Sequence, residues 1–253
     1  MVLVATWSDG LFVVSGETCE QELVTRSVRA LAPDGQGGAL AIVAGGSLRR
    51  RAPDGAWTTI ASAEFDFSCC VAVGDVIYAG TDDARVLRIG PGGALEQLHG
   101  FDAVAGRDTW YAGSAVINGE RVGPPLGIRS ITATADGSVL LANVHVGGTP
   151  RSTDGGATWQ STIDVDSDVH EVRAHPHRSD VVMAAAAIGL CTSRDGGVTW
   201  DVERAGLQAA YCSAVAFAGD DVLVSASAHH FAARGAVYRR QVDRHDSLVA
   251  VGG

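Results

Sequence analysis

Histidine and cysteine side chains in the second half of the sequence could bind a metal ion. His145, His170, His230 and Cys212 offer neutral imidazoles and a thiolate, which are donor types that suit zinc or copper. None of them stands in a local ligand motif such as Cys-x-x-Cys or His-Glu-x-x-His. The alternative is that each imidazole hydrogen-bonds to a loop carbonyl of a neighbouring element. The sequence therefore permits a zinc or copper site and requires no cofactor.

Carboxylates in the same region could catalyse glycoside hydrolysis. In that chemistry one acid stays protonated while a second carboxylate acts as base or nucleophile. Asp168 and Glu171 are the candidates, and Tyr211 and Arg129 complete the set. Because surface turns accumulate Asp and Glu in any protein, these carboxylates alone do not establish catalysis.

A third interpretation is a surface that binds a peptide, a glycan or a partner protein. Large aromatic side chains are effective anchors in such surfaces. The residues assigned to this surface are Trp7, Trp110, Tyr111, Arg129, His145, His170, Tyr211 and His229. For Trp110 the alternative is that the indole fills a space between neighbouring sheets.

The composition limits the partners. The 253-residue chain has a formal net charge of −10, and all 19 of its basic residues are arginine. The absence of lysine excludes lysine Schiff-base chemistry, and an acidic surface lacks the basic stripe that nucleic acid binding requires. Five irregularly spaced cysteines, no signal-peptide features and no long apolar run indicate a cytoplasmic protein with reduced thiols. We expect a monomer that binds neither nucleic acid nor membrane.

An internal repeat predicts the elements that position these residues. The segments GTPRSTDGGATW and GLCTSRDGGVTW match each other almost throughout and lie 41 residues apart. A period near 40 residues is typical of β-propellers, in which each repeat forms one four-stranded blade. The two strong copies and four weaker ones occupy residues 10–21, 46–57, 84–95, 148–159, 189–200 and 235–246.

Each copy follows an apolar alternating run, a short polar turn and a second apolar run. Such short runs, rich in Val, Ile and Ala and separated by Asp-Gly or Gly-Asp, are strand and turn signals. We therefore predict an all-β fold, a β-propeller of about six four-stranded blades, in a single domain over residues 1–253. Wider spacing between the third and fourth copies predicts an inserted hairpin at about residues 105–126. The ends of the chain either close one blade jointly or belong to a longer propeller of seven blades.

The two strong copies contain the pattern Ser-x-Asp-x-Gly-x-Thr-Trp, which has a structural explanation. The aspartates can accept hydrogen bonds from their own turn, the glycines permit positive φ, and the indoles can pack between blades. The residues with this predicted role are Ser152, Asp154, Gly156, Thr158, Trp159, Ser193, Asp195, Gly197, Thr199 and Trp200.

At these residues the chain resembles the Asp-box (BNR-repeat) propellers, the group that contains sialidases, sortilin-type receptor domains and photosystem II assembly factors. The resemblance implies a propeller, and it implies little about activity because the group includes both enzymes and binding proteins. A sialidase mechanism would use Tyr211 with Glu171 and a clamp of arginines. The Arg-Ile-Pro segment that supplies the first clamp arginine in sialidases is absent.

Strand order predicts where a site would form. The ends of second strands and the starts of first strands fall on one face of a propeller, and the Asp boxes fall on the opposite face. We therefore expect the histidines, Cys212 and the carboxylates to meet at the mouth of the axial channel. The favoured function is a non-enzymatic scaffold that binds a protein, peptide or carbohydrate there, and an exo-sialidase-like glycoside hydrolase is the alternative.

Overall fold

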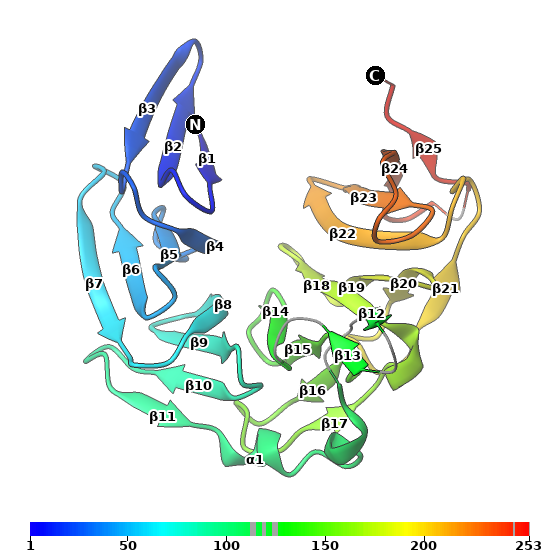
Figure 1. Ribbon diagram of the computed structural model, residues 1–253, viewed down its shortest axis with the longest axis horizontal. Coiled ribbons are helices and arrows are strands. Elements are labelled where there is room, and N and C mark those ends of the chain that lie inside the picture. Colours follow the sequence, from blue (N-terminus) through cyan, green and yellow to red (C-terminus); the bar gives the residue numbers. More distant parts are fainter. Residues whose placement is uncertain (112–114, 118–119, 123–125, 245, 253) are drawn as a thin grey trace. The chain divides into compact units, whose positions relative to one another are not determined.

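The computed structural model describes residues 1–111, 115–117, 120–122, 126–244 and 246–252. The chain forms two compact units, Met1–Leu98 and His99–Gly253, and each is described by itself. Nearly all regular structure is β-strand, and each four-stranded sheet is an antiparallel meander whose strands pair in sequence order. Sheets of this kind that follow one another along the chain are the blades of a β-propeller (Figure 1).

Unit 1 contains one three-stranded and two four-stranded sheets. The three-stranded sheet consists of β1 (Val2–Ala5), β2 (Leu11–Ser15) and β3 (Thr18–Glu22). The second sheet consists of β4 (Val28–Pro33), β5 (Ala39–Val43), β6 (Ser47–Arg51) and β7 (Trp57–Ser62). The third consists of β8 (Phe67–Val73), β9 (Val76–Thr81), β10 (Val86–Ile89) and β11 (Leu95–Gln97).

Unit 2 contains three four-stranded sheets. The first consists of β14 (Ile128–Ala133), β15 (Leu140–Val144), β16 (Pro150–Ser152) and β17 (Gln160–Ser161). The second consists of β18 (Val169–His175), β19 (Arg178–Ala186), β20 (Gly189–Ser193) and β21 (Asp201–Glu203). The third consists of β22 (Tyr211–Ala218), β23 (Asp221–Ser227), β24 (Gly235–Gln241) and β25 (Val249–Ala250).

Three short helical turns and one hairpin complete unit 2. The turns are α1 (His99–Asp102), η1 (Arg107–Thr109) and η2 (Val165–Ser167), and the hairpin pairs β12 (Ala115–Ile117) with β13 (Glu120–Val122). This hairpin lies inside the predicted insertion at residues 105–126, part of which falls outside the described residues. Among the described residues, no helix has the length and apolarity needed to cross a membrane.

The six copies of the repeat all fall on the hairpin that ends a sheet. They lie on β2–β3, β6–β7, β10–β11, β16–β17, β20–β21 and β24–β25. The predicted fold class is therefore confirmed, and the first sheet differs from the expectation in having three strands. The single domain over residues 1–253 stays a prediction.

Small and branched apolar side chains form the core of unit 2. All five residues of β15 and of β20 are buried, so both faces of these strands pack against apolar neighbours. Fully burying a Val or Leu side chain stabilises a fold by about 1.5–3 kcal/mol. One core cluster joins the second sheet of unit 2 to the third, through Met183, Leu190, Val215, Val224 and Tyr238.

Five first strands carry an extra residue near their start. The pairing with the second strand shifts by one residue in β4, β8, β14, β18 and β22. The residues passed over by these shifts are Arg29, Ser68, Arg129, His170 and Ser213. A bulge of this kind bends the strand and redirects a side chain, which is why bulges are frequent beside functional sites.

The residue after each bulge connects neighbouring first strands in unit 2. Ser130 Oγ accepts a hydrogen bond from the Val172 amide at 2.9 Å. One sheet further along, Glu171 Oε2 accepts one from the Val215 amide at 2.9 Å. These bonds satisfy the amides of Val172 and Val215 and connect β14 to β18 and β18 to β22.

Candidate functional site

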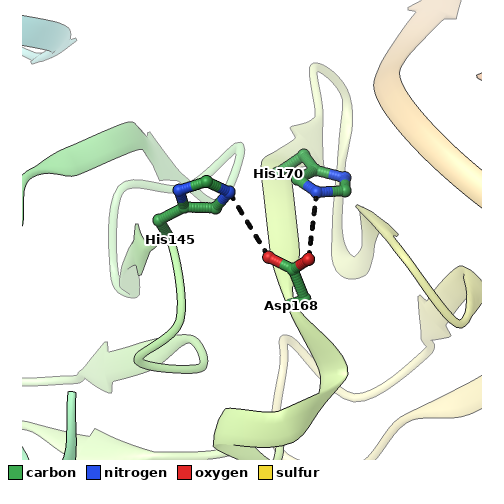
Figure 2. Close-up of side chains that lie close together, drawn as sticks. All are labelled: His145, Asp168 and His170. Atoms are coloured by element: carbon green, nitrogen blue, oxygen red, sulfur yellow. Dashed lines mark ion pairs between the residues drawn. The ribbon is translucent and has the colours of Figure 1, made fainter. Parts of the chain in front are cut away.

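Three polar side chains converge at the ends of strands in unit 2. Figure 2 shows the carboxylate of Asp168 between the imidazoles of His145 and His170. His145 Nε2 lies 3.4 Å from Asp168 Oδ1, and His170 Nε2 lies 3.6 Å from Asp168 Oδ2. One donor atom from each residue lies within 4.8 Å of the other two. The group therefore has the residue types and the spacing of a metal or small-ligand site.

A buried amide fixes the segment that carries His145. Asn143, at the end of β15, donates from Nδ2 to the Val169 carbonyl at 2.6 Å, and its Oδ1 accepts from Ser130 Oγ at 2.6 Å. Val146 exchanges backbone hydrogen bonds with Tyr111, which fixes the other side of His145. Buried polar groups of this kind are costly to break, so they hold His145 beside the start of β18.

A tight turn places Asp168 opposite the histidines. The turn begins at Asp164, whose Oδ1 accepts from the Asp166 amide at 2.8 Å, and continues through η2. Asp168 closes it in the left-handed region, at φ 50° and ψ 71°. Few residues other than glycine adopt this conformation, although Asp is among those that tolerate it. Strained backbone of this kind concentrates at functional sites.

The bulge in β18 directs His170 toward Asp168. His170 Nδ1 lies 2.6 Å from the carbonyl oxygen of Cys212. A carbonyl oxygen only accepts hydrogen bonds, so Nδ1 carries the proton. In the neutral ring, Nε2 is then unprotonated, and its lone pair faces the carboxylate.

Burial and charge set the protonation of this group near neutral pH. Burial, followed by the charge of Arg129, lowers the pKa of His145 to about 4, against the negative charge of Asp168, which raises it. Burial also opposes ionisation of Asp168, but the interaction with His170 and the charges of His145 and Arg129 outweigh it and lower the pKa of Asp168. The site at pH 7 therefore combines a neutral His145 with an ionised Asp168.

A row of aromatic and imidazole rings extends from these histidines to the surface. Its ring centroids are separated by 5.7 Å from His145 to His170, 4.6 Å from His170 to Tyr211 and 6.1 Å from Tyr211 to His230. The last step, from His230 to Phe231, is 3.9 Å. Phe231 is 76% exposed, so the row ends on an apolar side chain in contact with solvent. We call these five residues the ring row.

The predicted metal ligands are brought together only in part. His145 and His170 belong to the group of three, and Asp168, which was considered as a catalytic acid, is its third member. Cys212 contributes its carbonyl, while its thiol is buried and burial raises its pKa to about 12. His230 lies further along the ring row. Within the part of the chain that the structure describes, neither Cys212 nor His230 joins the group of three donors.

The candidate catalytic residues are mostly engaged in structural contacts. Glu171 Oε1 accepts from Arg173, and Oε2 accepts from the Val215 amide. Burial, followed by the charge of Asp168, raises the pKa of Tyr211, which disfavours the tyrosinate that a sialidase-type nucleophile requires. Arg129 is exposed on its bulge and acts on the group of three through its charge.

The other predicted binding residues lie in different surroundings. Trp110 is 6% exposed and packs against Phe101 of α1, which favours the alternative in which its indole fills a buried space over the surface anchor. Tyr111 is half-buried and uses its backbone to pair with Val146.

His229 is exposed beside His230, and its Nδ1 accepts from the Phe231 amide. Trp7 is exposed in unit 1, with the guanidinium of Arg29 over its ring at 5.3 Å.

The two strong copies of the repeat form turns closed by hydrogen bonds among their own side chains and amides. Asp154 Oδ1 accepts from the Thr158 amide at 2.9 Å, and Oδ2 accepts from the Thr158 hydroxyl at 2.6 Å. Ser152 Oγ donates to Asp154 and accepts from the Gly156 amide. The bonds from Thr158 are the main reason that the pKa of Asp154 falls to about 2. The second box repeats this arrangement with Ser193, Asp195, Gly197 and Thr199.

The two indoles of the boxes pack differently. Trp159 is buried, donates to the Gly156 carbonyl and meets the ring of Phe101 edge-on, with centroids 5.1 Å apart. Trp200 donates to Thr162 Oγ1, which belongs to the preceding sheet. The expected packing between blades is therefore found for Trp200, whereas Trp159 packs on α1.

Sequence reasoning missed two residues that shape the site. Asn143 interrupts the apolar run Leu-Leu-Ala-Asn-Val, and a polar residue in such a run signals a buried hydrogen-bonded position. Phe231 follows two histidines in the loop between β23 and β24, where an exposed phenylalanine has no role in the core.

Comparisons with known proteins show the fold. No family model matches the chain, and no curated protein matches it. The structure of YCF48 bound to D1 peptide aligns at a TM-score of 0.64 and 13% identity, over 98% of this chain and 77% of that one. The WD40 β-propeller domain of Doa1 aligns at a TM-score of 0.62 and 10% identity, over 99% and 74%.

An enzyme is also among the similar structures. An ancestral GH74 enzyme aligns at a TM-score of 0.61 and 13% identity, over 88% of this chain. This chain spans only 31% of the length of that enzyme. Identities this low establish a shared propeller fold, which occurs in enzymes and in binding proteins alike.

Proposed function

We propose that the chain is a non-enzymatic propeller that binds a peptide segment of a partner protein along the ring row. The observation that carries the proposal is the exposed ring of Phe231 at the end of a continuous row of neighbouring, mutually tilted rings. Aromatic anchors held by neighbouring side chains contribute most of the energy in many protein interfaces. The occupant that fits is a peptide with an apolar or aromatic side chain at its centre, which would pack on Phe231 and Tyr211.

Two features support binding over hydrolysis. The carboxylate oxygens of Glu171 are occupied by Arg173 and by the Val215 amide, so that carboxyl is not free to act on a sugar. The raised pKa of Tyr211 keeps its hydroxyl protonated. The similarity to YCF48, whose structure holds a D1 peptide, is consistent with a peptide ligand. A carbohydrate ligand is the alternative outcome of the tests below.

Peptide selection tests the proposal directly. Peptides enriched from a random displayed library on the immobilised protein are synthesised, and their Kd values are measured by fluorescence anisotropy. We expect Phe231→Ser and Tyr211→Ala to weaken binding about tenfold or more, as for anchor residues at interfaces. The control is Val198→Ser, because Val198 is 51% exposed on the second Asp box, away from the ring row.

Two outcomes would contradict the proposal. The first is that every enriched peptide binds Phe231→Ser as tightly as it binds the unaltered protein. The second is turnover of an aryl glycoside, including a sialoside, that is lost in Asp168→Asn or Glu171→Gln. The second result would establish the hydrolase in place of the binding protein.

A further inference from the structure

We propose that His145, Asp168 and His170 form a binding site for one divalent first-row transition-metal ion, such as Zn²⁺. Zinc bonds to nitrogen and oxygen of about 2.0–2.1 Å in a tetrahedron place the donor atoms about 3.3–3.4 Å apart. His145 Nε2 lies 3.4 Å from Asp168 Oδ1 and His170 Nε2 lies 3.6 Å from Asp168 Oδ2, which are separations similar to that value, and one donor atom from each of the three residues lies within 4.8 Å of the other two. An ion between the three side chains could therefore reach all of them with small side-chain movements (Figure 2).

The hydrogen bond of His170 prepares it as a ligand. Metal-binding histidines usually donate the proton of one ring nitrogen to a carbonyl or carboxylate, which leaves the other nitrogen free for the metal. The Cys212 carbonyl plays this part for His170 Nδ1 at 2.6 Å. The side chain of His170 is 9% exposed, so its free Nε2 is aimed into the site and is largely removed from water.

Two buried atoms of this group are open to coordination. His170 Nε2 and Asp168 Oδ1 are both buried, and neither has a hydrogen-bond partner among the described residues. In the neutral ring the Nε2 lone pair faces the carboxylate, and a metal ion bound between them would be coordinated by both. Buried polar atoms without partners are costly, and coordination of a metal ion would remove that cost.

The donor set selects the class of metal. Two imidazoles and one carboxylate suit zinc and neighbouring transition metals, whereas calcium and magnesium prefer shells of oxygen ligands. Three protein ligands leave a fourth tetrahedral position open, which water would fill. The guanidinium of Arg129 acts on both His145 and Asp168 and opposes a cation. Removing its charge should therefore strengthen binding.

Zinc titration of the untagged protein against a chromophoric chelator tests the site with the metal alone, so the result is independent of any peptide. We expect one zinc per chain, and no competition from excess magnesium or calcium. His170→Gln and Asp168→Asn should each weaken zinc binding by about 100-fold or more, because each removes a ligand. Arg129→Gln should strengthen it by about fivefold, because one nearby positive charge is lost.

Matched controls separate ligands from other residues of the same type. Asp166→Asn changes an exposed carboxylate two positions before Asp168, and His177→Gln changes an exposed imidazole after β18. Both controls should bind zinc as the unaltered protein does. Melting curves in a chelator check that each variant is folded, and the visible spectrum of bound cobalt should change in His145→Gln and not in His177→Gln.

Several results would overturn the assignment. They are the absence of saturable binding at one zinc per chain, unchanged affinity in folded Asp168→Asn, and equal losses in the ligand variants and in their controls. Absence of zinc binding together with intact peptide binding would overturn the metal site and leave the proposed function standing. Loss of zinc binding with intact peptide binding in His170→Gln would support the metal site and show that peptide binding does not depend on it.

Discussion

Asp195 and Asp168 both lie in turns of unit 2, and their carboxylates have opposite surroundings. Asp195 Oδ1 accepts from the Thr199 and Val198 amides, and Oδ2 accepts from the Thr199 hydroxyl at 2.6 Å. Asp168 Oδ1 is buried without a hydrogen-bond partner and faces an imidazole at 3.4 Å. A carboxylate that its own turn satisfies stabilises the fold, whereas one that is held unsatisfied is available to a ligand. The number of hydrogen-bond partners on each carboxylate oxygen therefore distinguishes a structural aspartate from one that can bind a ligand.

The largest expected difference between the two aspartates is in stabilisation by zinc. At a free zinc concentration 100 times Kd, binding to the folded state alone stabilises a protein by about 2.7 kcal/mol. We expect this gain in the unaltered protein and in Asp195→Asn, and at most about 0.4 kcal/mol in Asp168→Asn, because only the last variant loses a ligand and its Kd rises by about 100-fold or more. Urea unfolding with and without zinc measures it. An equal gain in Asp168→Asn would remove the distinction between the two residues.

Without metal, the order of the two effects should reverse. Asp195→Asn replaces a charged acceptor of several hydrogen bonds and should lower the free energy of unfolding by about 1 kcal/mol. Asp168→Asn should lower it by less than half as much, because Asn tolerates the left-handed backbone and no hydrogen bond to Oδ1 is lost. Urea unfolding in a chelator measures both. A larger loss in Asp168→Asn would show that its carboxylate is structural.

The contribution of Asp195 should disappear in acid. Burial opposes ionisation of Asp195, but bonds from Thr199 and Ser193 outweigh it and lower its pKa from 3.8 to about 2. Between these values the unfolded chain binds more protons than the folded one, so stability from this group is present above pH 4 and is lost toward pH 2. The difference in unfolding free energy between the unaltered protein and Asp195→Asn should therefore shrink from pH 5 to pH 2. Because the carboxylate is exposed, the effect is small and weakens with salt.

The smallest expected change tests which part of Cys212 matters. His170 is oriented by the backbone carbonyl of Cys212, and the thiol is buried and protonated near neutral pH. Cys212→Ala should leave the zinc Kd within about twofold of its original value, while His170→Gln raises it by about 100-fold. A similar loss of zinc affinity in both variants would show that the thiol of Cys212 is a metal ligand, as the sequence suggests.

The fold could be predicted because its signals are local and repeated. The Asp boxes around Asp154 and Asp195 contain their own hydrogen-bond partners, so the sequence of twelve residues suffices to specify the hairpin. At a period near 41 residues, a chain of 253 residues has room for about six such hairpins. The three strands of the first sheet were not anticipated, because the weak copy at residues 10–21 resembles the others and does not report how many strands precede it.

The site could be predicted only in part because it depends on departures from regular structure. Alternation along β18 and β22 would assign each side chain to a face, but the extra residues His170 and Ser213 interrupt that alternation. Because the bulges are not visible in the sequence, the thiol of Cys212 was proposed as a metal ligand, whereas in the structure its backbone carbonyl contacts His170. The direction of the Asp168 side chain depends on its own left-handed backbone at the residue that follows η2. The local sequence offers no clear signal for that conformation. For Trp110 the sequence left a surface anchor and a buried indole open, because an indole in an insertion gives no indication of whether it turns inward.

The repeated bulge separates the chemistry of this face from the stability of the sheets. In unit 2 the same backbone position holds Arg129, His170 and Ser213, which differ in charge, size and hydrogen-bonding capacity. Since the surrounding strands keep their pairing in all three cases, the fold tolerates exchange at this position. Arg129→His or Ser213→His would add an imidazole at this position. Single substitutions during evolution could therefore change which ligand this face binds while the strand pairing of the sheet stays the same.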